Sequence, residues 1–471
     1  MSARFWVGGT GNWSDNTNHW ATSSNGSPGA ALPTTLDTVT FDANSGGGTA
    51  TLDQNTAAPL GTFTTSFYTG TLDLNGYTIT TNSFVSTGSG TRTIKFSGGQ
   101  LTLPSTGSVM NMGAATNLTI DIAGGGTVKL TSASGTNRTV TGIASASLPN
   151  LWISAGTGNI TFNTVVCNNL DFTGFSGAFT STSAAQTVTI GGNLTCSSGM
   201  TMVDNTTGAA GFTFQFTSTG SGNTVTTNGC QVIGTFYFSG IGGSWTFQDN
   251  VTFLNYSNGL GTKTIEVGGG TVYLGSNTFN MGALWTNDYP VVRALYMQSA
   301  VLNLYGGDCF DLRDNTTFTF DSGTSVVHVY NGYIRLGDAA RVINQVNFES
   351  GASNQITGNA TITTLNLAAG ITLTGLTDTN PTVSYPNITV VTFNPTGSVG
   401  NLITIDYVNF VKSSGSVTAD YLNLSNSSAS GGATFLAGSH SNNITGNTGW
   451  YFIDPALVNV QNPTVAQLII Y

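Results

Sequence analysis

The sequence predicts an all-β protein built as an elongated, irregular β-helix, or solenoid. Short segments of alternating apolar and polar residues recur along the whole chain, and Gly or Asn turns separate them. No window keeps the i, i+3, i+4, i+7 apolar spacing of an amphipathic helix. The chain has 471 residues, whereas a single ordinary core stops growing near ~250–300 residues. A solenoid avoids this limit because its core grows along one axis.

The composition is that of an ordered protein with few charges. Apolar residues make up 39% of the chain and charged residues 7%, while disorder requires low hydrophobicity or high charge. The net charge of −10 comes from scattered acids, and no Lys/Arg cluster is present. We therefore expect no nucleic-acid partner and no binding to an anionic membrane. No 18-residue apolar run predicts a membrane-inserted helix, and the first residues show no signal-peptide pattern.

Residues 1–35 are predicted to form an N-terminal aromatic cap. Trp6, Trp13 and Trp20 lie seven residues apart, but the glycines at positions 8, 9 and 11 exclude a heptad helix. Because the first coil of a solenoid exposes unpaired strand edges, we expect these aromatic side chains to cover it.

Residues 36–215 and 216–388 are interpreted as two solenoid blocks. In the first, residues 71–74 and 77–80 alternate on either side of Asn75-Gly76, where positive φ angles are expected. Asn-Leu pairs begin at positions 117, 150, 169 and 193, which suggests coils of roughly 24 residues. At ~4.8 Å per coil the chain would extend about 80–90 Å. The segment 90–103 reappears as 261–274, which indicates duplication of a block of several coils.

Residues 389–450 are expected to form C-terminal coils and residues 451–471 an extended arm. The glycine-rich texture ends at Trp450, yet apolar side chains continue. We expect the arm to dock onto a partner protein or a neighbouring copy through Leu457, Val460, Leu468, Ile469, Ile470 and Tyr471. The alternative is that the arm folds back as a cap on its own solenoid.

The four cysteines are widely spaced and form no CxxC pair, so no zinc site, redox motif or cofactor is expected. The main interpretation is buried free thiols at Cys167, Cys196, Cys230 and Cys309. One disulfide between neighbouring coils is the alternative.

The densest acidic stretch contains Asp308, Asp311, Asp314 and Asp321, with Asp338 further on. We interpret these residues as solvated turn residues that pair with Arg313 and Arg335, and we assign no catalytic or metal-binding residue. The stretch does not match a calcium loop. Paired carboxylates on a polysaccharide-cleaving β-helix are the alternative interpretation.

Aromatic residues in or near an interruption of the repeat are candidate contacts for a glycan or a partner protein. These residues are Trp245, Trp285, Tyr289 and Tyr296. Packing in the core or in a loop is the alternative for each of them.

Both ends of the chain carry recognisable motifs. The opening reads Phe-Trp-Val-Gly-Gly-Thr-Gly-Asn-Trp-Ser-Asp from position 5, followed by Leu-Pro-Thr at position 32 and Val-Thr-Phe-Asp-Ala at position 39. The closing stretch includes Ser-Gly-Gly-Ala-Thr-Phe-Leu-Ala-Gly at positions 430–438 and Gly-Asn-Thr-Gly-Trp at positions 446–450. Together they resemble β-solenoid structural proteins of environmental tailed bacteriophages. Bacterial autotransporter adhesins have a similar opening, but the ending favours the phage proteins.

The resemblance implies a non-enzymatic structural protein on the virion surface, displayed as a tail fibre or adhesin-like appendage that contacts host surface glycans. Such a protein would assemble in the host cytoplasm and become extracellular. Its expected partners are other virion proteins and further copies of itself, for example in a trimer. Because the solenoid motif begins almost at once, a capsid decoration or head fibre is an alternative. A polysaccharide-degrading tailspike and a bacterial surface adhesin are the other two.

Overall fold

The structure is a computed structural model, and it describes residues 1–56, 59–113, 115–181, 186–203, 212–254, 264–286, 290–313, 317–337, 341–376 and 385–453. Strands account for 51% of the chain and helix for 1%, and the strands form a parallel β-solenoid of about 16 turns. The predicted all-β solenoid is therefore confirmed. The one helix among the described residues is α1 (Asn16–His19). Within the same residues, no helix has the length and apolar character to span a membrane.

The chain divides into two compact units. Unit 1 comprises residues 1–255 and 269–271, and unit 2 comprises residues 256–268 and 272–471. Strand β29 (Gly270–Tyr273) contributes residues to both. The predicted block boundaries after residues 215 and 388 remain predictions.

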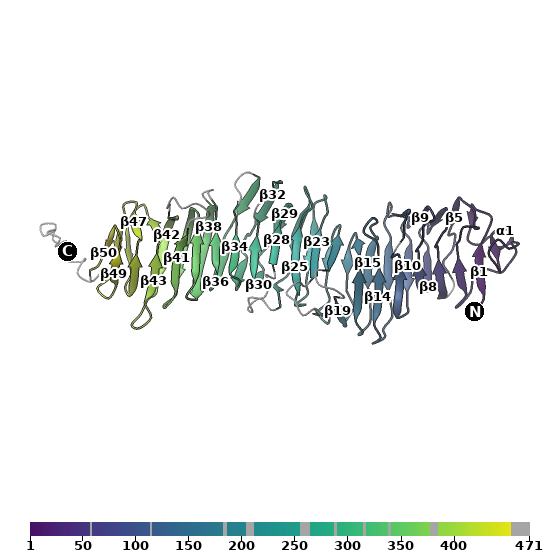
Figure 1. The fold of residues 1–471 in the computed structure, drawn as a ribbon, viewed down its shortest axis with the longest axis horizontal. Helices are drawn as coiled ribbons and strands as arrows, with labels where there is room; N and C mark the ends of the chain where they lie inside the picture. The colour runs from purple at the N-terminus through teal and green to yellow at the C-terminus, as the bar shows by residue number, and fades with distance from the viewer. Residues whose placement is uncertain are drawn as a thin grey trace. The chain divides into compact units, whose positions relative to one another are not determined.

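Unit 1 is built from four stacks of parallel strands, in which each strand pairs with its counterpart in the next coil (Figure 1). Sheet 1A contains β1 (Ala3–Trp6), β4 (Thr38–Thr40), β6 (Leu60–Thr64), β8 (Thr78–Val85), β11 (Gly107–Asn111), β14 (Arg138–Thr141), β16 (Ile160–Asn163), β19 (Ala178–Thr180) and β22 (Thr201–Val203). Sheet 1B contains part of β8 and then β10 (Gln100–Leu103), β13 (Thr127–Leu130), β15 (Asn150–Ile153), β18 (Leu170–Asp171), β21 (Leu194–Thr195), β24 (Asn223–Thr226) and β26 (Ser244–Phe247). Sheet 1C contains β2 (Gly11–Asn12), β5 (Thr49–Thr51), β7 (Thr71–Asp73), β9 (Arg92–Lys95) and β12 (Leu118–Asp121). Sheet 1D contains β17 (Val166–Cys167), β20 (Thr187–Ile190), β23 (Phe212–Phe216) and β25 (Gly234–Phe238). The remaining strands of unit 1 are β3 (Trp20–Ala21), which pairs with β1 in antiparallel fashion, and β27 (Val251–Thr252).

The coils of unit 1 stack through in-register apolar residues. In sheet 1B, Leu151 pairs with Leu170, Leu170 with Leu194 and Leu194 with Val225. All four side chains are fully or almost fully buried, because the period-2 alternation of a strand sends every second residue inward. Three of the four predicted Asn-Leu pairs place their leucine in this row of sheet 1B. The fourth pair, at position 117, leads into sheet 1C. In the row of sheet 1B, the residue before Leu151 is Val128.

The corner at Asn75-Gly76 behaves as predicted. Asn75 has φ 47° and Gly76 has φ 80°, the left-handed region that Asn and Gly tolerate best. The turn leads from β7 in sheet 1C to β8, which lies in sheets 1A and 1B. The chain therefore turns a corner of the solenoid here and does not double back as a hairpin.

The N-terminal cap is a tightly packed aromatic cluster. Trp6 and Trp20 are fully buried and Trp13 almost so. Trp6 and Trp20 pack edge to face, as do Trp13 and Trp20, while Phe41 stacks on Trp6 and Phe63 stacks on Trp13. The Trp20 Nε1–H donates to the Trp13 carbonyl at 2.8 Å, so the buried indole nitrogen is satisfied. The expected aromatic cover is therefore present.

Unit 2 repeats the same construction with three stacks and one extra pair. Sheet 2A contains β28 (Thr264–Val267), β31 (Ala283–Trp285), β34 (Asp308–Asp311), β37 (Tyr333–Arg335), β39 (Asn354–Thr357), β41 (Thr372–Leu376), β43 (Ile403–Asp406), β46 (Leu422–Ser425) and β49 (Asn442–Thr445). Sheet 2B contains β30 (Thr278–Met281), β33 (Val301–Leu304), β36 (Val326–Tyr330), β38 (Arg341–Ser350), β40 (Ala360–Leu367), β42 (Asn387–Pro395), β44 (Asn409–Val411) and β47 (Ser428–Ser430). Sheet 2C contains β45 (Ser416–Thr418), β48 (Thr434–Leu436) and β50 (Trp450–Tyr451), and β32 (Arg293–Tyr296) pairs with β35 (Phe318–Asp321).

A polar ladder follows six consecutive strands of sheet 2B. We call it the unit 2 ladder; its in-register members are Asn280, Asn303, His328, Asn347, Asn366 and Asn394. Amide groups bond from coil to coil, for example Asn366 Nδ2 to Asn347 Oδ1 at 2.6 Å and Asn394 Nδ2 to Asn366 Oδ1 at 2.9 Å. Stacked side-chain amides thus link the coils without charge.

The described part of the chain ends at residue 453. Tyr451, the first residue of the predicted arm, pairs with Leu436 as part of β50. The arm residues expected to dock, namely Leu457, Val460, Leu468, Ile469, Ile470 and Tyr471, lie outside the described residues.

Candidate functional site

Two adjoining hollows lie over sheet 1B in unit 1. The first has a volume of about 250 Å³ and is lined by Thr127, Asn150, Trp152, Asn169, Leu170, Asp171, Asn193 and Thr195. The second has a volume of about 630 Å³ and is lined by Thr173, Cys196, Ser197, Ser198, Asn228, Gly229, Asp249 and Asn250. The two adjoin because the chain continues from Asp171, the last residue of β18, to Thr173 in the second hollow, and from Thr195, the last residue of β21, to Cys196. Short polar side chains dominate both.

One row of the first hollow is a short asparagine ladder, the unit 1 ladder, formed by Asn150, Asn169 and Asn193. Asn169 Nδ2 donates to Asn150 Oδ1 at 2.7 Å, and Asn169 Oδ1 accepts from the Asn193 backbone N–H at 2.6 Å. Asn193 Oδ1 in turn accepts from the Thr224 backbone N–H at 2.7 Å. Among the described residues, the Nδ2 groups of Asn150 and Asn193 donate no hydrogen bond to the protein. Two amide donors are therefore available in the hollow.

The neighbouring row places an indole between opposite charges. Lys129, Trp152 and Asp171 occupy the same register position in β13, β15 and β18. The Lys129 ammonium lies 3.6 Å from the centre of the Trp152 ring, a cation–π contact. Trp152 is partly exposed, and its Nε1–H donates to the Thr173 carbonyl at 2.9 Å. The indole is thus held in a defined position at the border of the two hollows.

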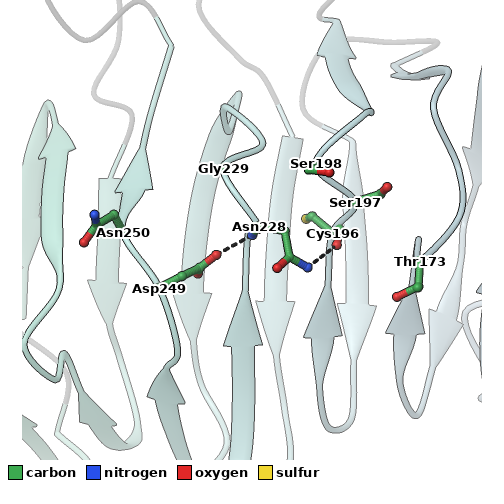
Figure 2. Close-up of a pocket in the computed structure, with 8 residues that line it drawn as sticks. All are labelled: Thr173, Cys196, Ser197, Ser198, Asn228, Gly229, Asp249 and Asn250. Carbon is green, nitrogen blue, oxygen red and sulfur yellow. Dashed lines mark hydrogen bonds between the residues drawn. The ribbon is translucent and has the colours of Figure 1, made fainter.

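The wall of the second hollow is a loop held by Asp249 (Figure 2). Its carboxylate accepts from the Thr227 backbone N–H at 2.8 Å, from the Thr227 hydroxyl at 3.2 Å and from the Asn228 backbone N–H. Asn228 Nδ2 donates to the Cys196 carbonyl at 2.9 Å, which ties the loop to the preceding coil. The left-handed conformation of Asn228, with φ 49°, is fixed by these contacts. Asp249 therefore fixes the position of the Thr227–Asn228 backbone, which forms one wall of the hollow.

All four cysteines are free and buried, as the main interpretation of the sequence held. The Cys230 thiol donates to the Gln231 carbonyl at 3.6 Å. The nearby Cys230 side chain and complete burial raise the pKa of Cys196.

The aromatic residues predicted as contacts do not form one site. Trp245 is fully buried and packs against Phe216 and Phe238, and its Nε1–H donates to the Gly192 carbonyl at 3.2 Å. The exposed contact proposed for Trp245 is therefore wrong, and core packing is its role. Tyr289 lies outside the described residues.

Trp285 and Tyr296 lie in unit 2 and are partly exposed. The Trp285 Nε1–H donates to the Asp308 carbonyl at 2.7 Å, and Tyr296 stacks on Tyr273 with 5.0 Å between ring centres. Both side chains are thus held by neighbouring coils. Their predicted contact with a glycan or partner remains a prediction.

The acidic stretch forms the ion pairs that were expected. Asp311 pairs with Arg313 and Asp308 pairs with Arg335, each at 2.7 Å. The expectation that these are solvated turn residues is wrong for Asp311, which ends β34 and is buried. Asp314 and Asp338 lie outside the described residues. Among the described residues, no group of three or more His, Cys, Asp and Glu side chains is placed to hold a metal ion.

Trp152 is the residue that sequence reasoning missed. It lies two positions after Asn150 in a strand whose leucine, at position 151, was recognised as part of the repeat. Alternation alone places position 152 on the outer face, so the signal was present. Comparisons of the chain with protein-family models, with curated proteins and with solved structures return no match.

Proposed function

We propose that the protein is a non-enzymatic structural protein of a phage virion, displayed on the particle surface, and that the two hollows of unit 1 contact a host surface glycan. The observation that carries the proposal is the partly exposed Trp152, held between Lys129 and Asp171 beside the free amide groups of Asn150 and Asn193. A sugar offers an apolar C–H face and a rim of hydroxyls. An indole packs against the C–H face, while amide donors and a carboxylate form hydrogen bonds with the hydroxyls.

The low charge of the site favours this ligand class. The lining of the two hollows contains two carboxylates and no arginine or lysine, and Asp249 already accepts three hydrogen bonds from its own loop. A neutral, hydroxyl-rich ligand gains from many short polar side chains without the desolvation cost of buried charges. The solenoid fold is compatible with a tail fibre, tailspike or adhesin.

Binding of the purified full-length protein to arrayed bacterial capsule and lipopolysaccharide glycans tests the proposal. For Trp152→Ala we expect a loss of affinity of about tenfold or more, as for a buried aromatic anchor, and Trp152→Phe should recover part of it. Tyr305→Ala is the matched control because it removes a partly exposed aromatic ring from unit 2. Equal affinity of wild type and Trp152→Ala on every glycan bound would contradict the proposed site.

The tailspike alternative predicts a different result. If the protein cleaves a glycan, reducing ends accumulate during the same incubation, and replacing Asp308, Asp311 and Asp314 by Asn abolishes their release. We expect no release. Antibody labelling of virions then distinguishes a tail fibre from a head decoration by the position of the label.

We further propose that residues 453–471 attach the protein to its virion partner or to a neighbouring copy. The apolar side chains of the sequence there would be worth ~1.5–3 kcal/mol each on burial. Deleting these residues should prevent incorporation into particles while the melting temperature of the isolated protein stays unchanged. A large fall in melting temperature with normal incorporation would instead identify a cap.

A further inference from the structure

Asn-Gly pairs occur in tight turns at several points along the chain. Those among the described residues begin at Asn25, Asn75, Asn228 and Asn331. Each of these asparagines has a positive φ, between 47° and 68°, which Asn tolerates better than most residues. A fifth pair, Asn258-Gly259, lies outside the described residues. Because the four described pairs have the same two residues, any difference in their chemistry comes from the structure around them.

Two of the four pairs hold the glycine backbone nitrogen in place. The Gly26 N–H donates to the Ser23 carbonyl at 3.0 Å. The Gly332 N–H donates to the Asn354 side-chain oxygen at 3.2 Å, and Gly332 is buried. Both glycines are also crowded. A Cβ at Gly26 would lie 2.7 Å from the Ser23 Oγ, and a Cβ at Gly332 would lie 2.6 Å from the Cys309 Sγ. The nitrogen in these two pairs is therefore neither free nor able to move.

In the other two pairs the glycine is open to solvent. Among the described residues, the N–H groups of Gly76 and Gly229 donate no hydrogen bond to the protein. Apart from its chain neighbours, a Cβ at Gly229 would meet no atom within 4 Å, and a Cβ at Gly76 would meet one carbonyl oxygen, of Ser97, at 3.9 Å. Both glycines are exposed, as are the asparagines before them. Water and base therefore reach the nitrogen, and glycine has no side chain to obstruct its movement.

The Asn228 amide ties together consecutive coils at the second hollow. Its Nδ2 donates to the Cys196 carbonyl of the preceding coil at 2.9 Å, and its backbone N–H donates to the Asp249 carboxylate of the following coil, as Figure 2 shows. Asn75 has a similar role earlier in unit 1, where its Nδ2 donates to the Leu52 carbonyl at 3.0 Å. Loss of either amide therefore removes a hydrogen bond between coils.

We propose that Asn75 and Asn228 are sites of spontaneous deamidation, with water as the co-reactant, and that the modification of Asn228 loosens the wall of the second hollow. The Gly229 backbone nitrogen loses its proton to base and attacks the Asn228 Cγ. The Cγ–Nδ2 bond breaks, the amide group leaves as ammonia with a proton from solvent, and a cyclic succinimide results. Water then adds to one of the two ring carbonyls, and the C–N bond at that carbon breaks. Asparagine and water thus give aspartate or isoaspartate and ammonia, without a change of oxidation state.

The product at position 228 cannot keep the contacts of the asparagine. A carboxylate has no N–H to donate, so it faces the Cys196 carbonyl as one acceptor opposite another. The new charge also lies on the loop that the Asp249 carboxylate holds, and like charges repel. Isoaspartate in addition lengthens the backbone by one methylene, which displaces the Thr227 and Asn228 N–H groups that Asp249 accepts from. The wall of the hollow therefore loses the bonds that fix its position.

Incubation of the full-length protein at mildly alkaline pH tests the modification, with the urea-denatured protein as the reference. Peptide mass spectrometry follows the conversion of each amide to an acid, and an isoaspartate methyltransferase labels the isomer. In the folded protein we expect conversion at Asn75 and Asn228, at a rate that rises with hydroxide concentration, and none at Asn25 and Asn331 in the same time. In the denatured protein all four should react. Equal rates at the four positions of the folded protein, or no reaction at Asn228, would overturn the proposal.

Variants separate the modification from its consequence. Asn228→Asp reproduces one product, and Asn75→Asp is the matched control because it also removes a bond to the preceding coil. We expect faster amide hydrogen exchange in residues 225–231 of Asn228→Asp, since the Asp249 bonds protect these N–H groups, and unchanged exchange there in Asn75→Asp. Asn228→Gln, whose longer side chain cyclises more slowly, should acquire no acid at this position. Equal exchange in Asn228→Asp and wild type would refute the effect on the hollow. None of these readouts requires a glycan.

Discussion

The two asparagine ladders differ in what their amide groups bond to. In the unit 2 ladder the Nδ2 of Asn303, Asn366 and Asn394 each donates to the side-chain oxygen of the preceding asparagine. In the unit 1 ladder only Asn169 does so. The oxygens of Asn169 and Asn193 accept backbone N–H groups of the following coil. As a result, unit 2 uses its amides within the ladder, while unit 1 leaves amide donors facing solvent.

The position of each asparagine relative to its strand explains the difference. Asn303, Asn366 and Asn394 lie inside β33, β40 and β42, so their side chains stack on one another along the outer face. Asn169 and Asn193 each come immediately before a strand, β18 and β21, and their oxygens accept backbone N–H groups of the next coil. The comparison indicates that a ladder inside the strands uses its amides for stability, whereas a ladder at their start leaves amide donors for a ligand.

The largest predicted effect tests whether the two units act independently. Leu365 in unit 2 and Leu194 in unit 1 are both fully buried and pair with apolar residues of the coils on either side. Replacing either with Ala should lower the free energy of unfolding by about 2–5 kcal/mol. Only Leu194→Ala should also weaken glycan binding, because it lies between Asn193 and Thr195 of the first hollow. Thermal unfolding and glycan binding measure the two effects. An equal loss of affinity in Leu365→Ala would show that the units are coupled.

The fold could be predicted from the sequence because a solenoid repeats its local signals. Alternation in segments such as 127–130 and turn residues such as Asn75-Gly76 recur along the chain, so single errors do not change the outcome. The spacing of coils could not be predicted as well. Asn117-Leu118 has the same two residues as the three Asn-Leu pairs of sheet 1B, but its strand belongs to sheet 1C. The position of the preceding corner, and not the Asn-Leu pair, determines which sheet a strand joins.

The candidate site was harder to predict because it depends on which side of a strand a residue occupies. Trp245 and Phe247 are two residues apart in β26 and both point inward; the alternation around Phe247 would have assigned Trp245 to the core. Trp152 points outward by the same rule.

A smaller effect is expected from Asn347→Ala in the unit 2 ladder. Asn347 is buried and accepts hydrogen bonds from Gln345 and Asn366. Its removal leaves these partners unsatisfied, so we expect a loss of about 1–3 kcal/mol in the free energy of unfolding. Asn394→Ala, at the exposed end of the same ladder, should cost about 0.5 kcal/mol or less. Denaturant titration distinguishes them, and equal losses would show that the ladder contributes little.

Acid should affect the N-terminal cap more than the C-terminal coils. Burial raises the pKa of Asp37. Hydrogen bonds from the Ser2 and Thr34 backbone N–H groups and from the Thr34 hydroxyl lower the pKa by more than burial raises it, so the net shift is downward. The unfolded chain then binds the proton more tightly, and the stabilisation is complete above pH ~4 and is lost as the pH falls through the folded pKa.

The counterpart in unit 2 is Asp420. Burial raises its pKa, but the hydrogen bond with His440 and bonds from two backbone N–H groups lower it overall. The sign is therefore the same, but the His440 side chain is 60% exposed, and water screens the pair. Below pH 4, Asp37→Asn should remove more of the pH dependence of the melting temperature than Asp420→Asn. A larger effect of Asp420→Asn would contradict this order.

A variant with a small predicted change in stability addresses binding most directly. Asn150 accepts one hydrogen bond, from Asn169, and its Nδ2 faces the first hollow. Asn150→Ala should therefore lower the free energy of unfolding by only about 0.5–1 kcal/mol, but it should weaken glycan binding several-fold because a donor to the sugar is lost. Asn394→Ala is the matched control: it removes the same amide from a ladder end in unit 2, where the Nδ2 already bonds to Asn366. Denaturant titration and binding to the same arrayed glycan measure both quantities. If the two variants lose equal affinity, or neither loses any, the free amides of unit 1 are not ligand donors, and the unit 1 ladder only joins the starts of its strands.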